Sequence, residues 1–198
     1  TLLASSAASD VYKRQLTHCI EAILSPRIDP PAEAVGLDGI EKVIREESLI
    51  RAVKDGQDKA ARWNMMMAST EGAMAFSKGL GAVHSMSHAI GANQELRLHH
   101  GTLNAVILPT VLRFNRNHVG DKYSKISRAM GKRDSSDLSE IIEILNIEIG
   151  LPSGLKEMGV TENMIPALID HSETDPSNAT TPRLPDREEW EKLFLDSM

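Results

Sequence analysis

Hydrophobic and polar residues follow one another along most of this chain with the spacing of amphipathic helices. Apolar residues recur every three or four positions, in segments separated by proline, glycine and short polar stretches. No convincing series of alternating apolar and polar residues indicates a β-sheet. The fold class is therefore predicted to be all-α. The predicted helices cover residues 16–24, 29–56, 57–78, 102–115, 119–132, 137–148, 160–172 and 186–198.

Local signals mark where several of these helices begin and end. The Ser-Pro pair at 25–26 should stop the first helix, because proline disfavours helical backbone in the residue before it. Gly56 is a candidate C-cap for the second helix. Asp186 and Glu189 have the spacing of a capping box at the start of the last helix. Residues 175–185, DPSNATTPRLP, are predicted to form a loop from their composition.

Composition narrows the class of protein. The chain has 198 residues, 41% of them hydrophobic, which is enough for one large domain. Aromatic residues make up 4%, so the core must be built from aliphatic side chains and methionine, as suits packed helices. A net charge of −6 argues against a nucleic-acid-binding surface. No apolar run is long enough to span a membrane, and the single cysteine, Cys19, fits a reducing compartment, so we expect a cytoplasmic protein.

Candidate chemistry is concentrated in residues 81–101, GAVHSMSHAIGANQELRLHHG, which hold four of the seven histidines. His84 and His88 are four residues apart, so on a helix they would share one face about 6 Å apart. Two further histidines precede Gly101, and His18 lies on the first predicted helix. Imidazole nitrogen is a good ligand for Zn²⁺ and Fe²⁺. Spacing alone leaves two interpretations open, a metal site or ordinary hydrogen-bonded histidines.

Four stretches of sequence, taken in order, resemble one known family. They are LTHCIEAILSPRIDP (16–30), MMMASTEGAMAFSKGLGAVH (65–84), GLGAVHSMSHAIGA (79–92) and HHGTLNAVILPTVLRFN (99–115). In order and approximate spacing they are similar to the iron-dependent (group III) alcohol dehydrogenases. That family has an N-terminal α/β domain, which binds NAD(P) through a glycine-rich turn, and a C-terminal all-helical domain, which holds the metal. The active site is the cleft between the two domains.

The resemblance implies a domain organisation for this chain. Residues 16–198 are expected to form the helical metal-binding domain, without the N-terminal nucleotide-binding domain. Residues 1–15, TLLASSAASDVYKRQ, are small and polar without a clear period, and the family pattern begins abruptly after them. Their sequence resembles a translated adapter-like tag. We therefore expect residues 1–15 to be non-native or disordered.

The same resemblance implies a set of metal ligands. The family binds Fe²⁺, sometimes replaced by Zn²⁺, through one aspartate and three histidines. By motif, the three histidines correspond to His18, His84 and His100. His99 could compete with His100, but His100 is preferred because it directly precedes the glycine. His88 corresponds to a residue beside the nicotinamide and substrate that is thought to help relay the proton.

One position departs from the family's pattern. The position of the family's aspartate, four residues before the first histidine ligand, holds Arg14. A guanidinium cannot ligate a cation and would repel it. Asp10 is no substitute, because eight residues of helix would separate it from His18 by about 12 Å. Either the site is altered in a natural variant, or residues 1–15 are not native sequence, and the second interpretation is preferred.

The resemblance implies an NAD(P)-dependent enzyme that interconverts an alcohol and an aldehyde or ketone by hydride transfer. Its partners would be a small alcohol or aldehyde and, in the intact enzyme, further copies of the same chain. The fragment by itself is expected to be inactive. A non-catalytic helical metal-binding or interaction domain is the alternative. A phosphohydrolase of the HD-domain type is disfavoured, because no histidine in the sequence is directly followed by an aspartate.

Overall fold

A computed structural model describes residues 15–93 and 95–198, and every regular element in these ranges is helical. The all-α prediction is confirmed for this part of the chain. The expectation for residues 1–15 falls, apart from Gln15, outside the described residues, as do the inferences about Asp10 and Arg14. The first described helix covers residues 15–24, and all ten of these residues are buried. A helix that is buried on every side lies inside the domain rather than on its surface.

The α-helices that follow pack around this first helix. Short 3₁₀ turns continue or precede several of them: η2 (Phe76–Lys78), η3 (Arg116–His118), η4 (Glu162–Met164) and η5 (Pro176–Thr180). The α-helices are α2 (Pro30–Ile40), α3 (Ser48–Lys54), α4 (Lys59–Ala75), α5 (Ala82–Gly91), α6 (His100–Asn115), α7 (Lys122–Ala129), α8 (Leu138–Glu148), α9 (Ile165–Glu173) and α10 (Arg187–Asp196).

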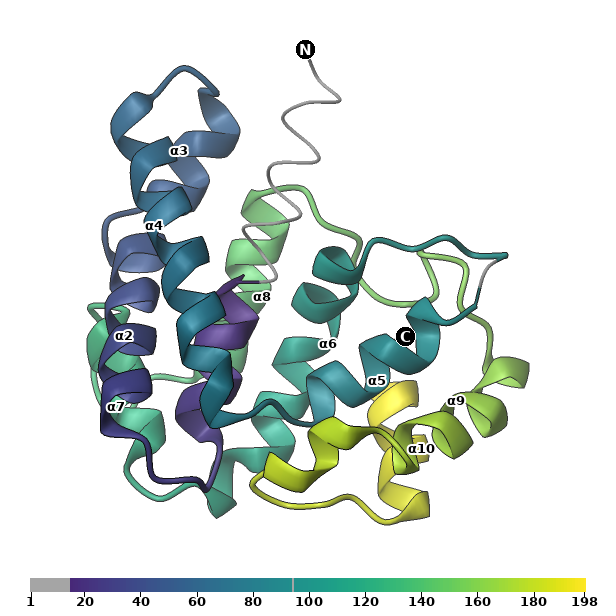
Figure 1. The fold of residues 1–198 in the computed structure, drawn as a ribbon. Helices are drawn as coiled ribbons and strands as arrows, with labels where there is room; N and C mark the ends of the chain where they lie inside the picture. Colours follow the sequence, from purple (N-terminus) through teal and green to yellow (C-terminus); the bar gives the residue numbers. More distant parts are fainter. Residues whose placement is uncertain (1–14, 94) are drawn as a thin grey trace.

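The helices form two groups on either side of the domain's centre. In Figure 1, α2, α4 and α7 lie on one side and α5, α9 and α10 on the other, while the purple first helix and α6 run between them. The pairs α2–α4, α5–α6, α5–α9 and α6–α8 pack directly against each other. A continuous aliphatic core joins both groups, and Trp190 and Phe194 of α10 are fully buried in it.

The predicted helix over residues 29–56 is wrong in its middle and at its end. Helix α2 widens into the π-helical turn η1 (Glu41–Arg45), and Glu47 then adopts a left-handed conformation with φ of 54°. The new direction lets α3 begin at Ser48 and bury Leu49 in the core. Gly56 is not the C-cap, because α3 ends at Lys54 with Asp55 in extended conformation. Core packing has overridden a continuous helical pattern.

Lysines hold the C-terminal end of the first helix, where the chain turns at Ser25 as predicted. Lys78 Nζ donates to the carbonyl of Ile23, and Lys122 Nζ donates to the carbonyl of Leu24, at 3.1 Å each. Carbonyl groups at a helix C-terminus carry partial negative charge, so ammonium groups stabilise them. This fixes the helix that carries His18.

A carboxylate compensates the charge of this lysine group. Glu33 lies 3.3 Å from Lys78 Nζ and 2.8 Å from Lys125 Nζ. The hydrogen bond from Lys125 lowers the pKa of Glu33 below its ordinary value of 4.5. Since Lys78 is fully buried, Glu33 supplies the opposite charge that a buried ammonium group needs.

Helix α6 passes through the core although it contains a proline. Pro109 cannot donate to the carbonyl of Ala105, four residues earlier. Asn146 of α8 donates its side-chain amide to that carbonyl at 2.7 Å. The bond satisfies the freed acceptor and ties α8 to the helix that begins at His100.

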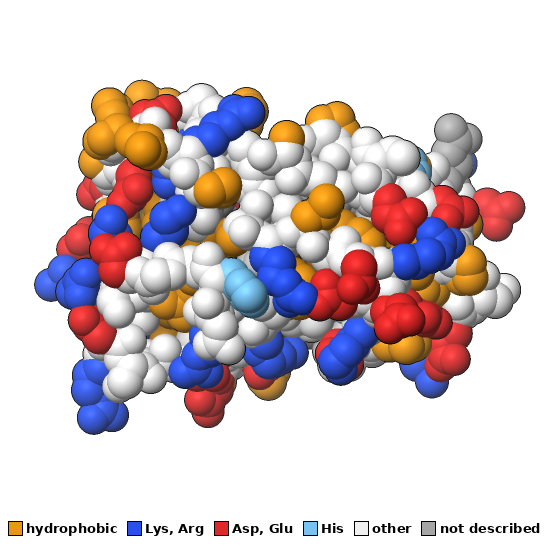
Figure 2. All heavy atoms as spheres, turned by 90° about the horizontal axis from the view of Figure 1, so that it is seen from below, with side chains coloured by type: hydrophobic (Ala, Val, Ile, Leu, Met, Phe, Trp, Pro, Cys, Tyr) orange, Lys and Arg blue, Asp and Glu red, His pale blue; other side chains and the backbone are white. Residues whose placement is uncertain are grey.

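The outer surface carries charges of both signs. Figure 2, seen from below, shows blue Lys and Arg and red Asp and Glu interspersed over this face, with hydrophobic side chains between them. Such a mixture does not form the single-sign field of a nucleic-acid-binding face. Among the described helices, none combines the length and apolar character needed to cross a membrane.

Candidate metal centre

Four histidines from three separate segments gather at one place inside the domain. His18 comes from the first helix, His84 and His88 from α5, and His100 from the start of α6. The ring centroid of His84 lies 4.8 Å from the ring centroid of His18 and 5.3 Å from that of His100. The rings of His88 and His100 stack at 5.1 Å with an angle of 11° between them. The structure therefore brings together all four predicted site residues.

A turn that contains Gly79 and Gly81 precedes α5, the helix that carries His84 and His88. Gly79 has φ of 119°, and a Cβ there would collide with the side chain of Thr180. Thr180 Oγ1 donates to the carbonyl of Leu80 at 2.7 Å. A Cβ at Gly81 would lie 3.1 Å from a carboxylate oxygen of Glu21. Glycine is needed at position 79, and a side chain at position 81 would crowd the Glu21 carboxylate.

Glu21 is the carboxylate that orients His84. It lies on the first helix, three residues after His18, and is 4% exposed. The Nδ1–H of His84 donates to Glu21 Oε2, and the backbone N–H of Val83 donates to Oε1 at 2.9 Å. A histidine whose Nδ1 donates to a carboxylate keeps the lone pair on Nε2, which is the form that binds a metal. Glu21 therefore turns the free nitrogen of His84 towards the other rings.

His88 has its own carboxylate. Its Nδ1 lies 2.9 Å from Asp175 Oδ2, just before the turn η5. Burial raises the pKa of Asp175, but hydrogen bonds from the backbone and side chain of Ser177 and from His88 outweigh it, so the pKa is lowered. The side chain of His88 is 42% exposed, whereas that of His84 is 1% exposed. Solvent therefore reaches the ring of His88 but not that of His84.

The segment around Asp175 is more ordered than predicted. Residues 176–180 form the 3₁₀ turn η5 rather than an irregular loop, and Asp175 caps it by accepting from the N–H of Ser177. Asn178 of this turn accepts from Ser85 Oγ of α5 at 2.8 Å. This hydrogen bond joins the turn η5 to α5, the helix that carries His84 and His88.

Asn104 lies between two of the rings. Its Nδ2 is 3.3 Å from Nε2 of His84 and 3.3 Å from Nε2 of His100. Both Nε2 atoms therefore face a common point. His99, the competing candidate, is exposed and occupies the N-cap position of α6. The observed arrangement favours His100 over His99 as a member of the cluster.

The cluster fits a transition-metal ion in the kind of donor it offers. Imidazole nitrogens suit Zn²⁺ and Fe²⁺, and a carboxylate behind a ligating histidine is the usual second partner. The arrangement is incomplete, because no three His, Cys, Asp or Glu side chains among residues 15–93 and 95–198 are placed to hold a metal ion. Two of the proposed donors, on His84 and His100, already face the same point, and His18 lies beside them.

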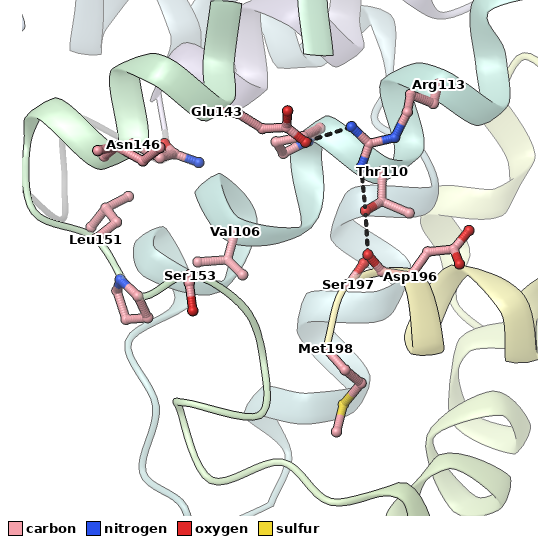
Figure 3. Close-up of a pocket in the computed structure, with 13 residues that line it drawn as sticks. Val106, Thr110, Arg113, Glu143, Asn146, Leu151, Ser153, Asp196, Ser197 and Met198 are labelled. Atoms are coloured by element: carbon pink, nitrogen blue, oxygen red, sulfur yellow. Dashed lines mark hydrogen bonds and ion pairs between the residues drawn. The ribbon is translucent and has the colours of Figure 1, made fainter. Parts of the chain in front are cut away.

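A separate cavity of about 390 Å³ lies between α6, α8 and residues 196–198 (Figure 3). Arg113 and Glu143 form an ion pair at 2.5 Å on its wall, and Thr110 donates to the carbonyl of Asp196 at 3.2 Å. None of the four clustered histidines lines it. The cavity is therefore distinct from the candidate metal centre.

Comparison of the whole chain with known protein families shows which family it belongs to. The description "Fe-containing alcohol dehydrogenase family, C-terminal" matches residues 14–198. The chain belongs to the iron-containing alcohol dehydrogenase family. The family and the fold predicted from the sequence are therefore confirmed.

Individual members of the family resemble this chain over nearly all of its length. A 4-hydroxybutyrate dehydrogenase from Cupriavidus necator is 42% identical over 190 residues, which are 92% of this chain and 49% of that protein. A 1,3-propanediol dehydrogenase from Citrobacter freundii is 32% identical over 188 residues, 90% of this chain and 48% of that protein. A crystal structure of a 1,3-propanediol oxidoreductase gives a TM-score of 0.91 at 30% identity, covering 98% of this chain and 52% of that one. The chain spans about half the length of these members of the iron-containing family.

Sequence reasoning missed three residues of the cluster. Glu21 and Asn104 stand three and four positions after His18 and His100, so helical spacing placed each on the same face as a candidate ligand. That signal could have found them. Asp175 lies 87 positions from His88 and carries no comparable local signal.

Proposed function

We propose that residues 16–198 form the metal-binding half of an NAD(P)-linked alcohol dehydrogenase, which interconverts an alcohol and an aldehyde or ketone by hydride transfer. In the intact protein a nucleotide-binding domain would precede this half. The membership of the chain in the family and its coverage of about half of each relative support this organisation. The gathering of four imidazoles, two of them backed by buried carboxylates, is the observation that carries the proposal.

The chain's own residues would divide the work as follows. His18, His84 and His100 would hold Fe²⁺ or Zn²⁺, and Glu21 keeps His84 in the tautomer that can bind it. When bound, the metal would act as a Lewis acid on the substrate oxygen, and the nicotinamide would carry the hydride. His88, half-exposed and hydrogen-bonded to Asp175, would move the substrate's proton between the site and solvent.

Relatives suggest which substrates to test. Two are named for 4-hydroxybutyrate and 1,3-propanediol, both small primary alcohols. We therefore propose small alcohols and aldehydes as substrates. The proposal also includes NAD or NADP as the cofactor, and a cytoplasmic, oligomeric enzyme when the protein is intact. The missing half of the cleft would complete the substrate pocket, so we expect the 198-residue chain by itself to show no measurable turnover.

Metal binding by this chain is the first test. The purified chain, stripped with a chelator, is titrated with Co²⁺, whose visible absorption reports its ligands. His84→Ala should weaken Co²⁺ binding by about tenfold or more. His118→Ala is the matched control, because His118 is exposed and lies outside the cluster, and it should bind like the wild type. Equal affinity in all three proteins, or no saturable binding by the wild type, would refute the metal centre.

Activity is tested on the intact gene product that contains this chain. NAD- and NADP-linked oxidation of 4-hydroxybutyrate and 1,3-propanediol should depend on added Fe²⁺ or Zn²⁺ and should be lost in His84→Ala. Metal binding without any dehydrogenase activity over a panel of small alcohols would favour the alternative, a non-catalytic metal-binding domain.

A further inference from the structure

Helix α4 and the turn η2 that follows it share an exposed face without charged residues, called the α4 face below. It consists of the exposed side chains between residues 63 and 77, which are Trp63, Met66, Thr70, Ala73, Met74, Phe76 and Ser77. Trp63, Met66 and Met74 are 60%, 48% and 57% exposed. Since 25% of the chain is charged and exposed helix faces are usually polar, an apolar face of this kind indicates a surface that binds another protein segment.

The spacing along the α4 face favours a helix as the binding partner. Four of its residues follow one another at intervals of three, four and four positions, namely Trp63, Met66, Thr70 and Met74. Residues at these intervals lie in one row along a helix. Two helices that pack side by side contact each other through rows of this kind. The helices of the described part of the chain leave this row exposed.

The row is complementary to a second copy of itself when the two helices run antiparallel. A two-fold axis beside Thr70 would place Met66 opposite the partner's Met74. The same axis would place Trp63 opposite the partner's Ser77, so that a bulky side chain faces a small one. Both pairs are centred on position 70. Each contact therefore occurs twice, which is the property of an interface with two-fold symmetry.

Charges at the two ends of α4 favour the antiparallel direction. Lys59 and Arg62 are exposed near its N-terminal end, where the helix dipole is positive. The last turn, residues 72–75, has the uncharged sequence GAMA. Basic side chains are favourable near the negative C-terminal end of a helix. An antiparallel neighbour brings the basic residues of each copy to such an end, whereas a parallel neighbour brings the like charges of both copies together.

We propose that this chain forms a dimer in which the α4 faces of two copies pack antiparallel about a two-fold axis beside Thr70. The inference goes beyond the proposed function and does not depend on the metal centre, because it rests on exposure, spacing and charge along one helix. One row of side chains is a smaller contact than the interface of a permanent dimer. We therefore expect a dimer that dissociates on dilution.

Tryptophan fluorescence of the wild-type chain is the first test. The chain has two tryptophans, of which Trp190 is fully buried in the core and Trp63 is exposed. Association should bury Trp63, so the emission should shift to shorter wavelength as the protein concentration rises. Trp63→Phe should remove this shift. Sedimentation velocity should show the mass of two chains at high concentration and of one chain at low concentration.

A charge beside the two-fold axis tests the interface itself. Thr70→Lys would bring two like charges together, so the dissociation constant of the dimer should rise by about 100-fold or more. Ile147→Lys is the matched control, because Ile147 is 77% exposed on α8, away from the α4 face. This control should dimerise like the wild type. Circular dichroism verifies that both variants are folded.

Cysteine cross-linking tests the direction of packing. Thr70→Cys should form a disulfide between two copies when treated with oxidised glutathione, because the axis brings the two positions together. Trp63→Cys should not, because the two copies of this position would lie about 21 Å apart along antiparallel helices. The native Cys19 is 1% exposed and should not react.

Several outcomes would overturn the proposal. A chain that stays monomeric at every concentration, or a Thr70→Lys variant that dimerises like the wild type, would mean that the α4 face does not bind a second copy. Cross-linking of Trp63→Cys without cross-linking of Thr70→Cys would mean that the helices are parallel. If Thr70→Cys cross-links in the 198-residue chain but not in the intact gene product, the upstream half covers the α4 face instead.

Discussion

Removing the carboxylate of Glu21 should lower both the stability of the fold and the affinity for metal. Glu21→Ala would leave two buried donors, the N–H of Val83 and the Nδ1–H of His84, without an acceptor. Each hydrogen bond to a charged group contributes about 1.5–3 kcal/mol, so we expect the loss of both to lower the free energy of unfolding by about 3–6 kcal/mol.

This loss converts into a measurable change in melting temperature. For a domain of this size, 1 kcal/mol corresponds to about 2–4 °C, so Glu21→Ala should melt roughly 6–24 °C below the wild type. Circular dichroism at 222 nm follows the unfolding of the helices. Because the ring of His84 would no longer be held in one tautomer and orientation, Co²⁺ affinity should also fall, by about 10- to 100-fold.

Glu71 separates the two effects. It is a buried carboxylate on α4 whose charged partner is Lys42, 3.2 Å away. Glu71→Ala should therefore lower the melting temperature and leave Co²⁺ affinity unchanged. If Glu21→Ala bound Co²⁺ as tightly as the wild type while remaining folded, Glu21 would be a structural residue and the argument from tautomer control would be wrong.

Three further predictions concern the surroundings of the cluster. Asp175→Asn should convert His88 from one tautomer to a mixture, visible in its imidazole ¹⁵N shifts; unchanged shifts would show that the carboxylate does not select the tautomer. Gly79→Ala should lower the free energy of unfolding by more than about 3 kcal/mol, because the new Cβ adds backbone strain and collides with Thr180. Gly120 also has a positive φ but has open space around it, so Gly120→Ala should lower the free energy of unfolding by only about 1–2 kcal/mol. Equal losses of stability in urea unfolding would contradict this. Glu33 has a pKa below 4.5 in the folded protein, so its stabilising effect is present above pH 4.5 and is lost as the pH falls through the lowered pKa. The stability difference between the wild type and Glu33→Gln should therefore be largest near neutral pH and shrink in acid, and a difference independent of pH would exclude the ionic contribution.

The sequence predicted the elements of this fold better than it predicted their contacts. Helical periodicity located most helices, and the capping box of Asp186 and Glu189 at the start of α10 is present. The break at Glu47 was not predicted, because each side of it is a good helix by its own pattern and only burial of Leu49 favours the bend. Local spacing carries no information about such tertiary choices.

In the candidate site, too, the sequence predicted contacts within one helix but not contacts between distant segments. Spacing within one helix put His84 and His88 on a shared face, and the structure agrees. The partners of these two rings come from elsewhere, Glu21 from 63 positions before His84 and Asp175 from 87 positions after His88. Pairings over such distances depend on how the helices pack, which no local pattern encodes.

Burial distinguishes two histidines that the sequence leaves equivalent. In the sequence, His84 and His88 are two members of one HxxxH pair, and either could ligate. In the structure each has its Nδ1 on a carboxylate, so both present Nε2 to the cluster. The side chain of His84 is 1% exposed and that of His88 is 42% exposed. A metal ligand benefits from a dry, fixed position, while a proton carrier must reach water, so the difference in exposure supports the proposed roles, metal ligand for His84 and proton carrier for His88.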